Sequence, residues 1–195
     1  MYYTSMPYRT FASNEYYHCY NRGTDKRIIF NDRQDYKYFL KSMRAYNTAE
    51  VRGKLRLHKN TETSVEPPIT ILSYCLLPNH FHLLLRSNIE NGISKYMQRL
   101  GVGYTMYFNK KYERSGGLFQ GTFKAKHVAT DQDLRQVFSY VVLNNKVHGI
   151  SDKALYRVAQ NNHDSVVRDL VLNYTQQQQV EAVQIIKELR LGFDE

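Results

Sequence analysis

The sequence predicts an α+β domain built on an antiparallel sheet and followed by a helical tail. Two observations support this prediction. β-Favouring runs alternate with segments whose apolar residues recur at helical spacing, in the order strand, helix, strand, strand, helix, strand, helix. A tight-turn sequence separates the two adjacent strands, which favours a hairpin. The first six elements match the split βαβ arrangement of ferredoxin-like domains, and 195 residues suffice for one well-packed domain.

The first strand and helix are predicted within residues 16–46. Residues 16–20 are β-favouring, and the turn-forming segment 21–23 closes them. Asn31 or Asp32 can cap the helix that follows, because asparagine and aspartate accept hydrogen bonds from free N–H groups at a helix start. The helix has a basic outer face and apolar residues at helical spacing, namely Tyr36, Phe39, Leu40 and Met43. The polar stretch 47–68 then favours a long loop containing a small basic hairpin at 51–58.

The central hairpin carries the first candidate functional residues. Residues 69–77 form an apolar run typical of a buried strand, and Pro78-Asn79 suits a tight turn. Side chains alternate faces on the return strand, so His80 and His82 share one face. Two imidazoles about 7 Å apart on a rigid strand can share one divalent cation. The alternative is a pair of half-buried structural histidines, backed by an opposite apolar face of Phe81, Leu83 and Leu85.

The second helix and the segment after it combine basic and aromatic residues. Apolar residues from Ile93 to Phe108 recur at helical spacing, and Gly101 and Gly103 each weaken the helix by about 1 kcal/mol relative to alanine. These glycines permit a bend or a close approach of another segment. Basic residues between positions 95 and 127 interleave with Tyr104, Tyr107, Phe108, Tyr112, Phe119 and Phe123. This mixture is typical of single-stranded nucleic-acid binding; the alternative is an aromatic core stripe beside a solvated charged face.

The last predicted strand spans residues 119–129, and a helix capped by Asp131 runs to about Asn145. Its apolar stripe contains Leu134, Val137, Phe138 and Val141, and Tyr140 falls at the edge of that stripe with Asn144 one turn further on. The remaining chain is predicted to carry a final helix over residues 177–191. We expect this tail to serve in packing or partner contact.

Composition limits the possible partners and the cellular compartment. The formal net charge of +9 favours a polyanionic partner. The sequence has no apolar run as long as a membrane span and no apolar core of a signal peptide near its start. Its two cysteines form no C-x-x-C motif, which favours buried thiols in a reducing cytoplasm. The 17 tyrosines make any single tyrosine weak evidence for a nucleophile.

Four sequence blocks in this order resemble the HUH single-strand DNA transposases that use one catalytic tyrosine. Within that group the chain looks most like the REP-associated tyrosine transposases and their insertion-sequence relatives. The resemblance covers roughly residues 14–150, which implies a transposase domain over residues 1–150 and a helical tail over 151–195. The blocks are residues 21–23, 78–82, 117–124 and 140–145.

The resemblance implies a specific chemistry. Tyr140 would attack a phosphodiester, forming a 5′-phosphotyrosine intermediate and a free 3′-hydroxyl before the strand is rejoined in DNA transposition. His80, His82 and Asn144 would hold Mg²⁺ or Mn²⁺, and Mn²⁺ suits imidazole ligands better. The partner would be single-stranded or hairpin DNA with a REP-like or element-end sequence, bound by a cytoplasmic, nucleoid-associated monomer or homodimer. The predicted DNA-binding residues are Arg22, Lys95, Arg99, Lys110, Lys111, Arg114, Lys124 and Lys126.

Three other functions fit part of the pattern. A ferredoxin-like protein that binds single-stranded nucleic acid without catalysis explains the charge and the aromatic residues. A zinc hydrolase explains the two histidines, but the sequence offers no convincing third strong ligand. A relaxase or replication-initiator nuclease shares the chemistry, but relaxases typically carry three histidines and an N-terminal tyrosine. The transposase hypothesis explains the histidines, Tyr140 and Asn144 together.

Overall fold

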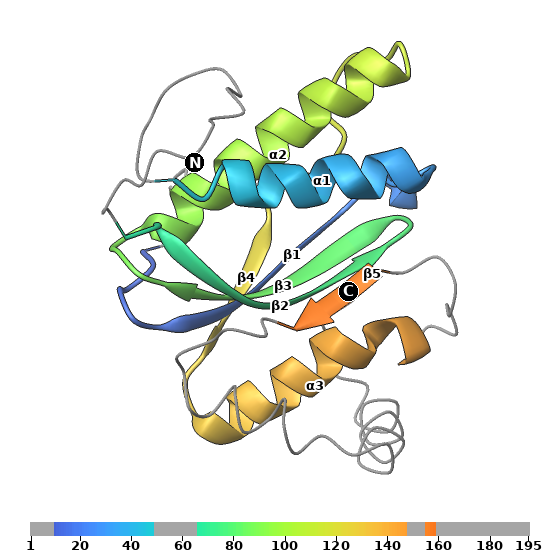
Figure 1. The fold of residues 1–195 in the computed structure, drawn as a ribbon. Coiled ribbons are helices and arrows are strands. Elements are labelled where there is room, and N and C mark those ends of the chain that lie inside the picture. The colour runs from blue at the N-terminus through green and yellow to red at the C-terminus, as the bar shows by residue number, and fades with distance from the viewer. Residues whose placement is uncertain (1–9, 49–65, 148–154, 159–195) are drawn as a thin grey trace, which may run out of the picture.

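The computed structural model describes residues 10–48, 66–147 and 155–158. They form a five-stranded sheet in the order β4-β1-β3-β2-β5, in which all neighbouring strands are antiparallel. Helices α1 and α2 cover one face of the sheet, and α3 covers the other (Figure 1). The order β4-β1-β3-β2 confirms the predicted ferredoxin-like arrangement. The strands are β1 (Tyr16–Arg22), β2 (Ile69–Leu77), β3 (His80–Ser87), β4 (Lys124–Val128) and β5 (Leu155–Val158), and the helices are α1 (Arg33–Ala45), α2 (Gly92–Lys111) and α3 (Asp131–Val147).

The two faces of the hairpin formed by β2 and β3 lie in different environments, as the alternation of side chains along β3 predicts. Phe81, Leu83 and Leu85 join the hydrophobic core beneath α1 and α2. His80 and His82 occupy the intervening positions of β3 and therefore face α3. The core on the α1 and α2 side also contains Tyr96, Tyr104 and Phe108 from α2. Of the aromatic residues predicted to face either a nucleic acid or the core, Tyr104 and Phe108 therefore belong to the core.

The start of α1 is tied to the end of α2 by a buried carboxylate. Of the two predicted caps, Asn31 and Asp32, the structure has Asp32 as the N-cap of α1, and Asp32 forms a capping box with Asp35. The Asp35 side chain is fully buried and accepts hydrogen bonds from Lys111 Nζ (2.7 Å), Tyr107 Oη (3.0 Å) and Tyr112 Oη (2.8 Å). Burial lowers the pKa of Lys111, but hydrogen bonds to Asp32 and Asp35 outweigh it and raise that pKa on balance. The cluster therefore links the two helices.

Gly103 of α2 allows a close approach of α1, whereas Gly101 does not face another segment. A Cβ atom added at Gly103 would lie 2.0 Å from Tyr46 Oη and 2.5 Å from Tyr46 Cζ. A Cβ atom added at Gly101 would meet nothing within 4 Å. Of the two explanations that the sequence leaves open for these glycines, close packing therefore applies at position 103.

This difference predicts opposite effects of the same substitution. Gly101→Ala should raise the free energy of unfolding by about 1 kcal/mol, because alanine is the better helix former. Gly103→Ala should lower it, because the Tyr46 ring must move away from the new methyl group. Urea denaturation followed by circular dichroism measures both. Equal stabilisation by the two variants would show that Tyr46 does not pack on Gly103.

The structure corrects three predictions about secondary structure: the start of one strand, the cap of one helix and the content of the C-terminal tail. β4 begins at Lys124, not at residue 119, because Gly121 adopts a φ of +92° and forms a turn with Phe119. The Thr130 hydroxyl accepts the hydrogen bond from the Asp133 N–H, so Thr130 caps α3 in place of Asp131. Within the tail predicted to be helical, residues 155–158 form β5, which pairs with β2 at the edge of the sheet. The hairpin predicted at 51–58 and the helix predicted at 177–191 lie outside the described residues.

Candidate functional site

Strand pairing places the two histidines of β3 beside polar residues of β1. In the antiparallel register, Tyr20 lies opposite His82 and Arg22 lies opposite His80. Residues directly opposite one another in an antiparallel pair share a face of the sheet. The rings of Tyr20 and His82 are stacked, with centroids 5.6 Å apart. The centre of the sheet therefore presents imidazole, phenol and guanidinium groups toward α3.

A third histidine, His18, belongs to this site and was not among the residues predicted for it. His18 is fully buried, and its Nε2 lies 2.9 Å from Nδ1 of His82. Its ring also stacks on Tyr20 and on His82, with both centroid distances 5.1 Å. The strand period indicates that His18 and Tyr20 share a face. The sequence gives no register between β1 and β3, however, so it did not reveal the contact with His82.

Helix α3 places the Tyr140 ring against His82 and His18. The Tyr140 ring lies edge-on to His82 and His18, with centroids 5.3 Å and 5.7 Å away. Its exposed fraction is 2%, so it is more enclosed than its predicted place at the edge of the apolar stripe implies. Residues 140–144 are all buried, so more than one side of the helix is covered here.

Asn144 lies one turn beyond Tyr140 and is also fully buried. Neither its Oδ1 nor its Nδ2 has a hydrogen-bond partner among the described residues. Burying an amide without partners is costly, and most buried polar groups in native proteins are paired. A ligand that binds to Asn144 would remove this cost.

His80 is oriented by the turn residue before it. His80 Nδ1 lies 2.6 Å from Asn79 Oδ1, and its ring is edge-on to His82 with centroids 5.1 Å apart. The hairpin thus holds the predicted pair of imidazoles close together on one face.

Among the described residues, no group of three or more His, Cys, Asp or Glu side chains could hold a metal ion. Any cation here would need another kind of ligand in addition to the histidines.

Comparison with known proteins identifies the family. The model of the family described as "Transposase IS200 like" matches residues 40–144, which is more than half of the chain. The chain belongs to this family. The match contains His80, His82 and Tyr140, and it ends at Asn144, whereas His18 and Arg22 precede it.

A solved structure supports the fold of this IS200-like transposase. It is described as a REP-associated tyrosine transposase bound to a REP hairpin. The TM-score is 0.53 at 12% sequence identity, and the match covers 76% of each chain. A search of curated proteins found no match.

The predicted DNA-binding residues of this transposase lie on two sides of the sheet. Arg22, Lys124 and Lys126 share the face of the histidines, because Lys124 lies opposite Tyr20 and Lys126 opposite His18. Lys124 Nζ lies 5.9 Å from the centre of the Tyr20 ring. The other predicted residues lie on or just after α2, across the sheet from the histidines: Lys95, Arg99, Lys110, Lys111 and Arg114.

Three of the residues on the α2 side have partners within the protein. Lys111 binds Asp32 and Asp35, Arg99 donates to the Thr48 carbonyl, and Arg114 donates to Asn109. Lys95 and Lys110 are exposed. The basic residues that the sequence places in one segment are therefore not one continuous surface around the histidines.

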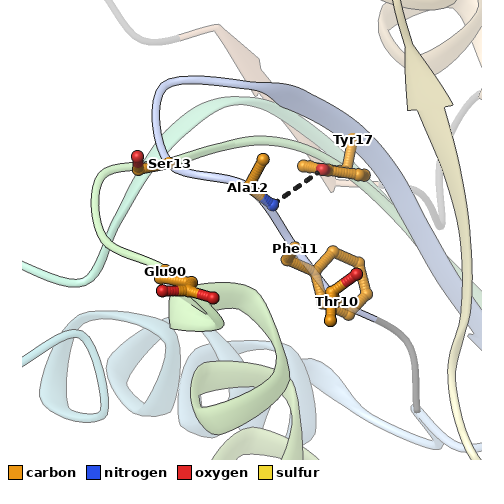
Figure 2. Close-up of a pocket in the computed structure, with 6 residues that line it drawn as sticks. All are labelled: Thr10, Phe11, Ala12, Ser13, Tyr17 and Glu90. Atoms are coloured by element: carbon orange, nitrogen blue, oxygen red, sulfur yellow. Dashed lines mark hydrogen bonds between the residues drawn. The ribbon is translucent and has the colours of Figure 1, made fainter.

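A pocket at the start of β1 is separate from the histidine site. Figure 2 shows its lining and the hydrogen bond from the Ala12 N–H to Tyr17 Oη. Tyr17 packs in the core on the opposite face of the sheet from His18. The lining has no histidine and no basic residue, and consists of Thr10, Phe11, Ala12, Ser13, Tyr17 and Glu90.

Among the described residues, no helix is long and apolar enough to cross a membrane.

Proposed function

We propose that this transposase cleaves and rejoins single-stranded DNA through a covalent bond to Tyr140. The observation that carries the proposal is the contact of the Tyr140 ring with His82, while Asn144 extends from the same helix one turn away. A phenol and an amide from α3, the amide without hydrogen-bond partners among the described residues, thus lie against the face of the sheet that carries the two imidazoles of β3. The family match supports transposase activity on DNA, and the site supplies groups suited to it.

The proposed reaction is a transfer of one phosphoryl group. The Tyr140 oxygen forms a bond to phosphorus as the bond to the 3′-oxygen breaks, and the phenol loses its proton. The leaving oxygen gains a proton and becomes a free 3′-hydroxyl, while the 5′-phosphate stays on Tyr140. A 3′-hydroxyl can then attack the phosphotyrosine and displace the phenol, whose ordinary pKa of about 10 makes it a competent leaving group. The number of phosphodiester bonds is conserved, so joining needs no ATP.

The residues present fit a divalent cation held by His80, His82 and Asn144. The buried amide of Asn144 lacks hydrogen-bond partners among the described residues, and an amide oxygen is a suitable ligand for Mg²⁺ or Mn²⁺. Two imidazoles favour Mn²⁺, because Mg²⁺ prefers oxygen ligands. A bound cation would neutralise a non-bridging phosphate oxygen and orient the bond to be broken. Arg22, whose Nε is buried without a hydrogen-bond partner among the described residues, lies opposite His80 and would bind the same phosphate.

The low exposure of Tyr140 favours one alternative, a protein of the same fold that binds single-stranded DNA without cleaving it. At 2% exposure the ring is enclosed, so a phosphate reaches its hydroxyl only if α3 or the chain around it moves. An incubation with single-stranded hairpin DNA and Mn²⁺, followed by a denaturing gel, distinguishes the two functions. The transposase proposal expects a covalent protein–DNA adduct and a shortened strand with a 3′-hydroxyl. Tight binding with no adduct at any Mn²⁺ concentration would support the alternative.

The position of the basic residues predicts which of them bind DNA. Removing Lys124 and Lys126 together should make the negative slope of log affinity against log salt shallower by about 1.4, because each phosphate contact to a single strand contributes about −0.7 to that slope. Removing Lys95 and Lys110, which are exposed on the other side of the sheet, provides a matched control with the same change of charge. Fluorescence anisotropy with a labelled hairpin across a salt series measures both slopes. A larger effect of the α2 pair would place the DNA on the wrong face for Tyr140.

A further inference from the structure

Both histidines of β3 have their Nδ1 atoms engaged by side chains of the protein. Nδ1 of His80 lies 2.6 Å from Oδ1 of Asn79, and Nδ1 of His82 lies 2.9 Å from Nε2 of His18. We propose that Asn79 and His18 are positioning residues, which make Nε2 the metal-binding atom of both histidines. This inference rests on the proposed function, because it concerns the orientation of ligands in the same site.

The amide of Asn79 determines which nitrogen of His80 carries the proton. Asn79 Nδ2 donates a hydrogen bond to the Lys26 carbonyl at 3.3 Å, so Oδ1 is the atom directed at His80. A carbonyl oxygen only accepts, and therefore Nδ1 of His80 must donate. A neutral imidazole has one N–H group, which leaves the lone pair on Nε2 for a cation.

The backbone around Lys26 holds the Lys26 carbonyl in place. Asp25 and Lys26 both adopt left-handed conformations, with φ of 55° and 58°, in the short 3-10 helix η1 (Thr24–Lys26). The Lys26 N–H donates to the Gly23 carbonyl within this turn, and the Gly23 N–H donates to the Asn79 carbonyl, which joins the turn to the hairpin. Non-glycine residues in this conformation are strained, and such strain often accompanies functional sites. The turn thus supports Asn79, which in turn orients His80.

The pair of His18 and His82 permits only one arrangement that leaves His82 able to bind a cation. In a hydrogen bond between two neutral imidazoles, one nitrogen donates and the other accepts. If His18 donated, His82 would carry its proton on Nε2, where no cation could bind. His18 must therefore accept through Nε2, and its buried ring, stacked on Tyr20 and His82, is held in position to do so. His18 then has the same role toward His82 that Asn79 has toward His80.

Loss of either acceptor should weaken the site without removing a ligand. Partners of metal-bound histidines typically contribute 10- to 100-fold to metal affinity, so Asn79→Leu and His18→Phe should each raise the dissociation constant for Mn²⁺ by about that factor. Both substitutions approximately keep side-chain volume, and phenylalanine keeps the stacked ring. Asn79→Asp keeps an oxygen acceptor at position 79, and His18→Gln supplies one at position 18, so both variants should keep most of the wild-type affinity for Mn²⁺. Isothermal titration of the full chain with Mn²⁺, in the absence of DNA, measures these values.

Asn88→Ala is the matched control at the opposite end of the hairpin. Asn88 bonds to Thr70 and to the Pro67 carbonyl, so its loss should lower the melting temperature and leave the Mn²⁺ affinity unchanged. If the wild type binds Mn²⁺ and the folded Asn79→Leu and His18→Phe variants bind it equally well, the positioning roles of Asn79 and His18 are wrong, but the proposed metal site stands. A wild-type chain that binds no Mn²⁺ would overturn the metal site of the proposed function as well.

A measurement on the unsubstituted protein tests the same inference without relying on variants that fold. Long-range proton–nitrogen NMR spectra of the metal-free chain distinguish the two neutral forms of each histidine. The expected result is a proton on Nδ1 of both His80 and His82. A proton on Nε2 of either ring at neutral pH would contradict the proposed role of its partner.

Discussion

Replacing Tyr140 by phenylalanine is expected to abolish the covalent adduct with single-stranded DNA while leaving DNA binding nearly intact. The substitution removes only the attacking oxygen, and the ring can still pack edge-on against His82 and His18. The proposed reaction has no other oxygen in that position, so the loss should be complete on a denaturing gel. Binding measured by fluorescence anisotropy on the same samples separates the loss of chemistry from a loss of affinity.

The control for this experiment is Tyr38→Phe, because the chain has 17 tyrosines and a single gel band does not name the one attached. Tyr38 stacks on Tyr107 across α1 and α2, away from the histidines, so its hydroxyl should not be needed for the adduct. Peptide mass spectrometry of the wild-type adduct identifies the attached residue directly. Attachment to any tyrosine other than Tyr140, or an undiminished adduct in Tyr140→Phe, would disprove the assignment.

The sequence predicts the relative placement of candidate site residues that are close together along one element. Strand alternation puts His80 and His82 on one face, and helical spacing puts Asn144 one turn beyond Tyr140. The roles proposed for these four residues come from the family resemblance and not from periodicity. Local residue preferences likewise predict the cap of α1, given as Asn31 or Asp32 and found at Asp32, and the turn at Pro78-Asn79. Each of these features depends on the chain within about five residues.

Features that depend on pairing between distant segments could not be read in this way. His18 contacts His82 across 64 positions, and only the register of β1 against β3 brings them together. The role of Lys111 likewise depends on Asp35, 76 positions earlier, so a residue predicted to bind DNA proved to connect two helices. β5 has only four residues, too few for a clear pattern, and it forms where the edge of β2 is available for pairing.

The buried cluster of Asp35, Lys111, Tyr107 and Tyr112 should dominate the stability of the α1 and α2 layer. Burial and the hydrogen bond to Asp35 raise the pKa of Tyr107 to about 12, so this phenol stays protonated and donates at neutral pH. Asp32, on the exposed side of the cluster, has a lowered pKa, chiefly through its hydrogen bond to Lys111. Its contribution to stability is therefore present at neutral pH and lost as the pH falls below its ordinary value of about 3.8.

Asp35→Ala should destabilise the protein by about 3 kcal/mol, because removing one partner of a buried ion pair leaves the other charge poorly compensated. The substitution also removes the acceptor for Tyr107, Tyr112 and the Asn31 N–H, all of which bond to this carboxylate. The Lys111 side chain is 20% exposed and keeps Asp32, which places the expected loss at the lower end for buried pairs. Urea denaturation followed by circular dichroism suits a chain without tryptophan.

Ser42→Ala is the matched control for Asp35→Ala on the same helix. Ser42 is fully buried, but its hydroxyl has no hydrogen-bond partner among the described residues, so its removal should be neutral or slightly stabilising. Equal, small effects of both substitutions would mean that the cluster does not hold α1 to α2 in solution. A large loss in the free energy of unfolding, seen in Asp35→Ala and not in Ser42→Ala, would show that the bond between Asp35 and Lys111 stabilises the fold. The contribution of Lys111 to DNA binding should then be tested only in variants that retain the native stability.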